Sequence, residues 1–184
     1  ESEWVSRMAE AVRTSDLGKV PSLSVRTGAK IPYGFEILSY GEQAEPSAVV
    51  YETDLAVVEE DARGHWKPRV IVEAKIKSVT THDAITYSQK AAAHKAVHPY
   101  LRYGVMLGMR QHQPLPGRLY RHGVHFDFMI SFSGQQPTSK EMSRFSALLL
   151  EEVEASRTLE KILYESRSRS RDQYTILHRK LWVE

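Results

Sequence analysis

Apolar and polar residues in the first half of the chain follow patterns typical of one helix and three strands. Apolar residues recur at helical spacing from Trp4 to Val12, which predicts a short first helix with Ser2 as its N-cap. A polar, glycine-containing loop at 61–68 separates two strand-like segments, so we expect these two to form a hairpin. Enrichment in β-branched and aromatic residues predicts strands at 34–40, 48–60 and 70–76.

The second half of the chain predicts two more helices and two more strands. Thr81 is a suitable cap for an alanine-rich helix from His82 to about Tyr100. An apolar stripe predicts a long helix over 139–166. Buried strands are predicted at 103–107 and, from the alternation of Phe126, Phe128, Ile130 and Phe132 on one face, at 126–132.

The order of these elements favours an α/β fold of the mixed α+β kind. Helix, three strands, helix, two strands and helix suggest a central mixed five-stranded sheet flanked by helices, with a long C-terminal helix. We expect a single domain over 1–184, with its core at about 1–135 and the C-terminal helix and basic tail at about 139–184.

Composition narrows the classes of site and location. The chain has no cysteine, which excludes disulfides, thiolate metal sites and cysteine nucleophiles, so a metal must use oxygen or imidazole ligands. Without a membrane-length apolar run or a signal pattern, we expect a soluble, intracellular, cytoplasmic protein with no membrane partner. No Walker loop, dinucleotide fingerprint or serine-nucleophile elbow is present, so no organic cofactor is expected. The chain opens with Glu1 rather than methionine, which leaves open that it is a fragment.

Two acidic residues and a lysine converge at the third predicted strand. Along 70–76 the even positions are apolar, which places Glu73 and Lys75 side by side on the opposite face. If the hairpin turns within its glycine-containing loop, antiparallel pairing places Asp54 roughly opposite Lys75 and diagonal to Glu73. Hard divalent cations prefer oxygen ligands, and the Ala74 carbonyl adds one, so we expect a Mg²⁺ site in which Mn²⁺ can substitute.

Such a site has the chemistry of phosphodiester hydrolysis. A bound cation polarises a phosphoryl oxygen and lowers the pKa of a bound water, while Lys75 offsets charge in the transition state. The alternative is that Glu73 and Lys75 form a solvated salt bridge of little energetic value. The acidic Asp54 on the preceding strand and the flanking apolar runs favour the metal site.

Asp54 and the triplet Glu73-Ala74-Lys75 at the end of an apolar strand resemble the motif of the PD-(D/E)XK nuclease superfamily, which has the restriction-endonuclease-like fold. Thr53 stands where the name-giving proline would be, a position that varies within the superfamily. The resemblance implies a helix–three strands–helix–strand core and Mg²⁺-dependent DNA cleavage. It also implies metal ligation by Asp54 and Glu73, with Lys75 as the catalytic lysine.

The same resemblance suggests supporting residues around the metal ligands. Some members add an acidic residue from the first helix, for which Glu10 or Glu3 is the candidate, although both also suit a solvated helix surface. Exonuclease-like members carry a glutamine followed one turn later by a tyrosine, and Gln89 and Lys90 lie on the corresponding helix. Ala93 occupies the tyrosine position, which weakens the exonuclease subtype.

Basic and amide side chains are candidates for DNA contact. Arginine and glutamine read base edges in the major groove, and an Arg-Ser run near the C-terminus suits a phosphate backbone. A polar loop and a solvated tail are the alternatives. The candidates are Arg102, Arg110, Gln111, Gln113, Arg118, Arg121, Arg167, Arg169 and Arg171.

Two groups of histidines suggest zinc only weakly. His94 and His98 lie four residues apart on a predicted helix, but no third ligand is evident. His122 and His125 lie near Asp127, which we expect on the polar side of its strand.

Together these patterns predict a Mg²⁺-dependent DNA endonuclease of the type II restriction kind, which cuts double-stranded DNA as a homodimer. The alternatives are a repair or recombination nuclease or junction resolvase of the same fold, and a non-catalytic nucleic-acid-binding module. A nuclease domain from a larger defence or repair protein also fits. The nearly balanced charge, with 25 Lys and Arg against 23 Asp and Glu, suits acidic charge at a metal site and basic charge at its rim.

Overall fold

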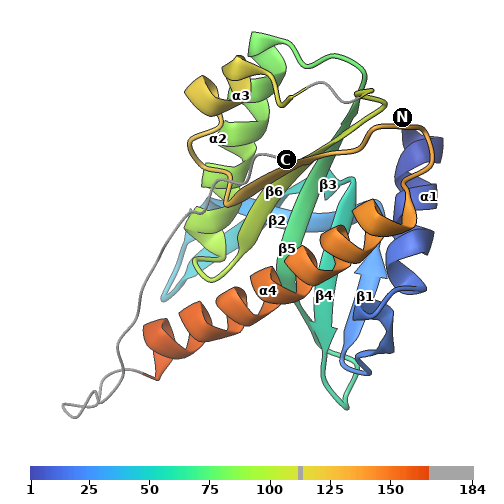
Figure 1. The fold of residues 1–184 in the computed structure, drawn as a ribbon. Helices are drawn as coiled ribbons and strands as arrows, with labels where there is room; N and C mark the ends of the chain where they lie inside the picture. Colours follow the sequence, from blue (N-terminus) through green and yellow to red (C-terminus); the bar gives the residue numbers. More distant parts are fainter. Residues whose placement is uncertain (112–113, 166–184) are drawn as a thin grey trace.

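The computed structural model describes residues 1–111 and 114–165, and its centre is a five-stranded mixed sheet (Figure 1). Its strands are β1 (Leu23–Arg26), β4 (Leu55–Glu60), β5 (Trp66–Ile76), β6 (Arg102–Gly108) and β7 (Phe128–Ser131). They lie in the order β1-β4-β5-β6-β7. β4 is antiparallel to β1 and β5, whereas β6 is parallel to both β5 and β7. The expected mixed α/β fold with a five-stranded sheet is thereby confirmed.

Helices cover both faces of this sheet (Figure 1). They are α1 (Ser2–Arg13), α2 (Thr81–Val97), α3 (Gly117–His122) and α4 (Ser139–Tyr164), with a short 3-10 helix at Leu17–Lys19. α1 and α4 pack on one face, and α2 and α3 pack on the other. Capping boxes at Thr80 and Thr138 satisfy backbone N–H groups at the starts of α2 and α4, which explains where these two helices begin.

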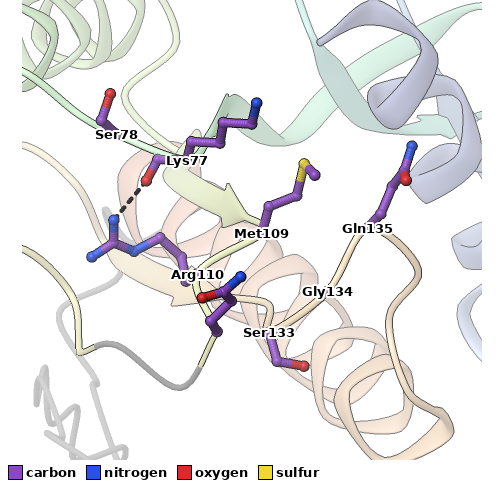
Figure 2. Close-up of a pocket in the computed structure, with 8 residues that line it drawn as sticks. Lys77, Ser78, Met109, Arg110, Ser133, Gly134 and Gln135 are labelled. Carbon is purple, nitrogen blue, oxygen red and sulfur yellow. Dashed lines mark hydrogen bonds between the residues drawn. The ribbon is translucent and has the colours of Figure 1, made fainter.

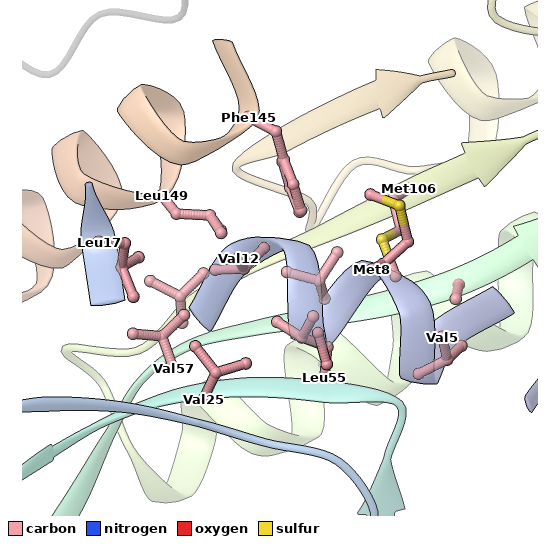
Figure 3. Packing of buried hydrophobic residues seen from close by; sticks show 14 of the residues in the cluster. Val5, Met8, Val12, Leu17, Val25, Leu55, Val57, Met106, Phe145 and Leu149 are labelled. Atoms are coloured by element: carbon pink, nitrogen blue, oxygen red, sulfur yellow. The ribbon is translucent and has the colours of Figure 1, made fainter. Parts of the chain in front are cut away.

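Alternation along β5 divides its side chains between two cores, as the sequence predicts. Val70, Val72 and Ala74 are fully buried on the face covered by α1 and α4. Figure 3 shows Met8 of α1 and Phe145 of α4 in that core. Ile71 and Glu73 point instead toward the core on the α2 side, where Glu73 lies near Lys90 of α2.

The hairpin of β2 (Ala29–Tyr40) and β3 (Ala44–Thr53) forms a separate two-stranded sheet. Ile31 at its base is fully buried in the core on the α2 side, whereas Tyr40 near its tip is exposed. The prediction of one strand over 48–60 is therefore wrong. The chain leaves the hairpin at Asp54 and enters the central sheet as β4, and the unpredicted β1 completes the five strands.

The pairing of β4 with β5 also corrects the expected register. Leu55 lies opposite Val72, so the same register places Asp54 opposite Glu73 rather than Lys75. The hairpin turns nearer the start of its loop, with Glu60 opposite Trp66, and this accounts for the shift, while the irregularity between Val57 and Val58 offsets part of it.

Smaller differences concern the ends of elements. Glu1 rather than Ser2 is the N-cap of α1, and Thr80 rather than Thr81 caps α2. β7 begins only at Phe128, and Phe126 packs in the core on the α2 side rather than with Phe128 and Phe132. Within 1–111 and 114–165, none of the helices combines the length and apolar character needed to cross a membrane.

Candidate active site

Asp54 lies where the chain passes from the hairpin into the central sheet. Its Oδ2 accepts a hydrogen bond of 2.7 Å from the backbone N–H of Ala74. β4 begins at Leu55, opposite Val72, so β5 has no β4 partner beyond that point. The Asp54 carboxylate thus accepts the backbone hydrogen bond that a longer β4 would have accepted from this edge of β5. The N–H and C=O groups of one residue in an extended strand point to the same edge, so the Ala74 carbonyl also faces it.

Glu73 is a buried acid, with 2% of its surface exposed. The Tyr103 hydroxyl donates a 2.6 Å hydrogen bond to its Oε1, and Lys90 Nζ lies 3.7 Å from its Oε2. Burial raises the pKa of Glu73, and the neighbouring Asp54 carboxyl raises it further, while Tyr103 and Lys90 oppose the rise. Two carboxyl groups therefore lie side by side in a poorly solvated place.

Lys75 follows on the same face of β5 and is partly exposed. Its Nζ lies 3.8 Å from Oδ1 of Asp83 and 3.9 Å from Oε2 of Glu1. Asp83 is the acidic member of the capping box that starts α2. The ammonium group is thus flanked by carboxylates at the end of the strand.

Lys90 and two tyrosines complete the surroundings of Glu73. The Lys90 ammonium lies 5.1 Å from the ring centre of Tyr51 and 5.4 Å from that of Tyr87, so both rings stabilise its charge. Burial raises the pKa of Tyr87, and the charges of Glu73 and other nearby carboxylates raise it further, so its hydroxyl stays protonated at neutral pH. The same two causes raise the pKa of Tyr103.

The sequence reasoning missed Tyr87 and Tyr103. Tyr103 follows Arg102 and begins the apolar run 103–107, in which no alternation of polar and apolar residues indicates which face it occupies. Tyr87 lies three residues before Lys90, which is the spacing of neighbours on one helix face and was the available signal.

The donors at this edge suit a hard cation. The Asp54 carboxylate, the Glu73 carboxylate and the Ala74 carbonyl supply oxygen atoms, and a cation would relieve the repulsion between the two acids. In the described part of the chain, no cluster of three or more acidic or histidine side chains is placed to bind a metal. The candidate set thus consists of two carboxylates and a backbone oxygen, with further positions left to solvent or substrate.

The expected acidic residue from the first helix takes a different form. Glu10 is exposed and lies 3.4 Å from Arg13, and Glu3 pairs with Arg7 along the surface of α1. The acidic residue of this region that approaches Lys75 is Glu1, whose Oε2 also accepts a 3.4 Å hydrogen bond from the Ile76 N–H. Gln89 is exposed on α2, whereas its neighbour Lys90 points to Glu73.

The candidate DNA-contacting residues divide into four groups. Arg102 is largely buried and pairs with Asp127 and Glu152, which leaves little of its guanidinium for a phosphate. Arg110 and Gln111 lie at the end of β6, while Arg118 and Arg121 are exposed on α3. Gln113, Arg167, Arg169 and Arg171 lie outside the described residues.

His94 and His98, one of the two histidine groups considered for zinc, each contact a backbone carbonyl. His94 is fully buried, its Nδ1 lies 3.1 Å from the Pro32 carbonyl, and burial lowers its pKa to about 4. His98 Nδ1 lies 3.3 Å from the His94 carbonyl. Asp127, expected on the polar side of its strand, lies just before β7, and its largely covered side chain pairs with Lys95 at 2.6 Å and with Arg102.

Comparison with known proteins adds no assignment: no family model matches the sequence, and no curated protein matches it significantly. The resemblance to PD-(D/E)XK nucleases therefore depends on the residues and geometry described above.

Proposed function

We propose that this protein is a Mg²⁺-dependent nuclease that hydrolyses phosphodiester bonds in DNA, with a restriction-endonuclease-like fold. One observation carries the proposal: Asp54 and Glu73, distant from each other in sequence, bring their carboxyl groups together at one end of β5, and Lys75 follows Glu73 on the same face of that strand. Placing the buried Glu73 beside a second, partly buried acid is unfavourable for folding, so a ligand that needs both is the simplest reason to keep them.

Each residue has a separate task in this proposal. Asp54, Glu73 and the Ala74 carbonyl would hold Mg²⁺, which when bound polarises a phosphoryl oxygen and acidifies a coordinated water. The Tyr103 hydroxyl keeps Glu73 oriented and favours its ionised form. Lys75 is exposed enough to meet a phosphate, and its charge stabilises the negative charge that develops on the phosphoryl oxygens.

The narrower proposal is a type II restriction endonuclease that acts on double-stranded DNA as a homodimer. This subtype follows from the chain length and the resemblance. A repair nuclease or junction resolvase would use the same three residues, and the pattern of cleavage products distinguishes these possibilities.

The test is cleavage of plasmid and linear DNA with Mg²⁺, with Mn²⁺ and with a chelator. We expect cleavage only with metal, and we expect Lys75→Ala and Asp54→Asn each to slow it by about a hundredfold or more. Lys19→Ala and Asp16→Asn are matched controls, because these two residues form a surface pair 2.7 Å apart, and both should cut normally.

Thermal unfolding followed by circular dichroism would verify that the variants fold. Discrete products would indicate a specific endonuclease, and a smear would indicate a nonspecific nuclease or an exonuclease. If Lys75→Ala cuts at the wild-type rate, the assigned mechanism is wrong. If the wild-type protein binds DNA but fails to cut it with every divalent ion tested, the protein is a binding module.

A further inference from the structure

A hollow lies just beyond the candidate active site, at the carboxyl ends of β5, β6 and β7. Its volume is about 520 Å³, and the residues used below are Lys77, Met109, Arg110, Gln111, Ser133 and Gln135 (Figure 2). Lys77 follows Lys75 by two residues, so the hollow and the candidate active site share the end of β5. None of the described residues that line it is acidic.

The backbone around this hollow is strained. Lys77, Met109 and Gln111 have φ values of 64°, 59° and 49°, and within the described residues they are the only non-glycine positions with positive φ. Each such conformation costs of order 1 kcal/mol, and strain of this kind is concentrated at functional sites. All three residues line the same hollow. One function of this hollow would explain all three strained conformations together.

Backbone hydrogen bonds hold these residues in place. Lys77 N–H donates to the Gly108 carbonyl at 2.9 Å, and Gln111 N–H donates to the Ser133 carbonyl at 2.9 Å. The three strand ends are therefore tied together, and the hollow is formed before any ligand arrives.

Arg110 gives the hollow a fixed positive charge. Its Nη1 donates to the Lys77 carbonyl at 2.6 Å and its Nη2 to the Pro114 carbonyl at 3.2 Å (Figure 2 shows the first). Its Nε is buried and has no hydrogen-bond partner among the described residues. Both terminal nitrogens of Arg110 already donate to carbonyls, so its guanidinium is poorly placed for a bidentate contact with a phosphate. Its positive charge still makes the electrostatic potential of the hollow more positive.

We propose that this hollow binds one nucleobase of the DNA next to the bond that is cut. The proposal rests on the nuclease function and names a subsite for it. The Gln111 and Gln135 amides would hydrogen-bond to the base edge, Met109 would contact its face, and Lys77 would lie toward the adjoining phosphate. Glutamine amides match the donor and acceptor pattern of base edges, and the volume falls in the range of small-ligand sites, larger than a phosphate alone requires.

The five methionines of the chain allow a direct test of this subsite. The full chain would be labelled with ¹³C at its methionine methyl groups and titrated in the presence of a chelator. The probes are the four deoxynucleoside 5′-monophosphates, deoxyribose 5-phosphate and inorganic phosphate. Met109→Leu assigns its signal, and the fully buried Met8 and Met106 are internal references.

We expect at least one nucleotide to shift the Met109 signal in a saturable manner, while Met8 and Met106 stay unchanged. Gln111→Ala should weaken that binding at least threefold, whereas Gln43→Ala, at an exposed glutamine between β2 and β3, should not. Equal shifts with phosphate or deoxyribose phosphate, no shift with any nucleotide, or unchanged affinity in Gln111→Ala would overturn the proposal. The titration needs neither metal nor cleavage, so its failure is distinguishable from failure of the nuclease function.

Discussion

At the scale of single residues, Glu73 explains why the site needs its neighbours. An ionised carboxylate this deeply buried is unfavourable unless other groups offset the loss of water. Tyr103 supplies a hydrogen bond and Lys90 supplies a positive charge, yet burial still dominates and keeps the pKa of Glu73 above its ordinary value. A cation bound beside Glu73 would favour its ionised form.

Tyr103→Phe tests this balance. The hydroxyl stabilises the ionised form of Glu73, so removing it should raise the pKa of Glu73 further. Only the carboxylate can hold a cation, so the acidic limb of the activity profile should move to higher pH. A hydrogen bond to a charged group contributes about 1.5 kcal/mol or more, which corresponds to a displacement of about one pH unit.

The measurement is the pH dependence of Mg²⁺-dependent cleavage. Tyr120→Phe, at a half-exposed tyrosine on α3, is the control and should leave the profile unchanged. If the acidic limb of Tyr103→Phe stays in place or moves to lower pH, the assigned role of the hydroxyl is wrong.

At the scale of elements, β5 was predictable because the even positions of 70–76 are all apolar, whereas the odd positions include the charged Glu73 and Lys75. Alternation along 70–76 correctly placed Glu73 and Lys75 together, and the hairpin with the preceding strand brought Asp54 close. The break at Asp54 was not predictable, because 48–60 is rich in β-forming residues on both sides of it. Which sheet each half joins is decided by packing against α2, and local propensity carries no information about that.

β1 and α3 were missed for a related reason. β1 has four residues, too few for alternation to distinguish a strand from a loop. α3 has six residues and follows a stretch with two prolines, so its sequence indicates a turn. Both become ordered through burial, and Leu119 of α3 is completely buried in the core on the α2 side.

The attachment of α4 to the sheet provides a prediction about stability. Arg69 of β5 is 5% exposed, and its Nη2 lies 2.7 Å from Glu59 of β4 and 2.7 Å from Glu160 of α4. Arg69→Ala removes the cation and leaves two partly buried carboxylates near each other, so it should lower the free energy of unfolding by about 3 kcal/mol. Urea unfolding measures this loss.

Lys67→Ala is the matched control for Arg69→Ala. Lys67 also pairs with Glu160, at 2.6 Å, but its side chain is 57% exposed, so its loss should cost less than about 1 kcal/mol. Equal destabilisation by the two variants would mean that burial of Arg69 does not set the strength of this attachment.

At the scale of the whole molecule, the distribution of charge matters more than its total. The formal net charge is only +2, and in the proposed nuclease Asp54 and Glu73 would lie where a DNA phosphate binds. Lys75, Lys77 and Arg110 occupy the surrounding strand ends. In the proposed nuclease, DNA and cation therefore bind cooperatively, because each reduces the electrostatic cost of the other.

This arrangement predicts metal-dependent DNA affinity in the absence of cleavage. Ca²⁺ prefers the same oxygen ligands, so it should tighten binding of a fluorescent DNA duplex about tenfold, equivalent to about 1.4 kcal/mol. The double variant Asp54→Asn, Glu73→Gln should bind DNA without metal as tightly as the wild-type protein does with Ca²⁺, because the repulsion is gone. Fluorescence anisotropy at constant ionic strength measures both effects, with Asp16→Asn as the control. A double variant that still requires Ca²⁺ for tight binding would place the cation site elsewhere on the molecule, and the charge pattern at the end of β5 would then need another explanation.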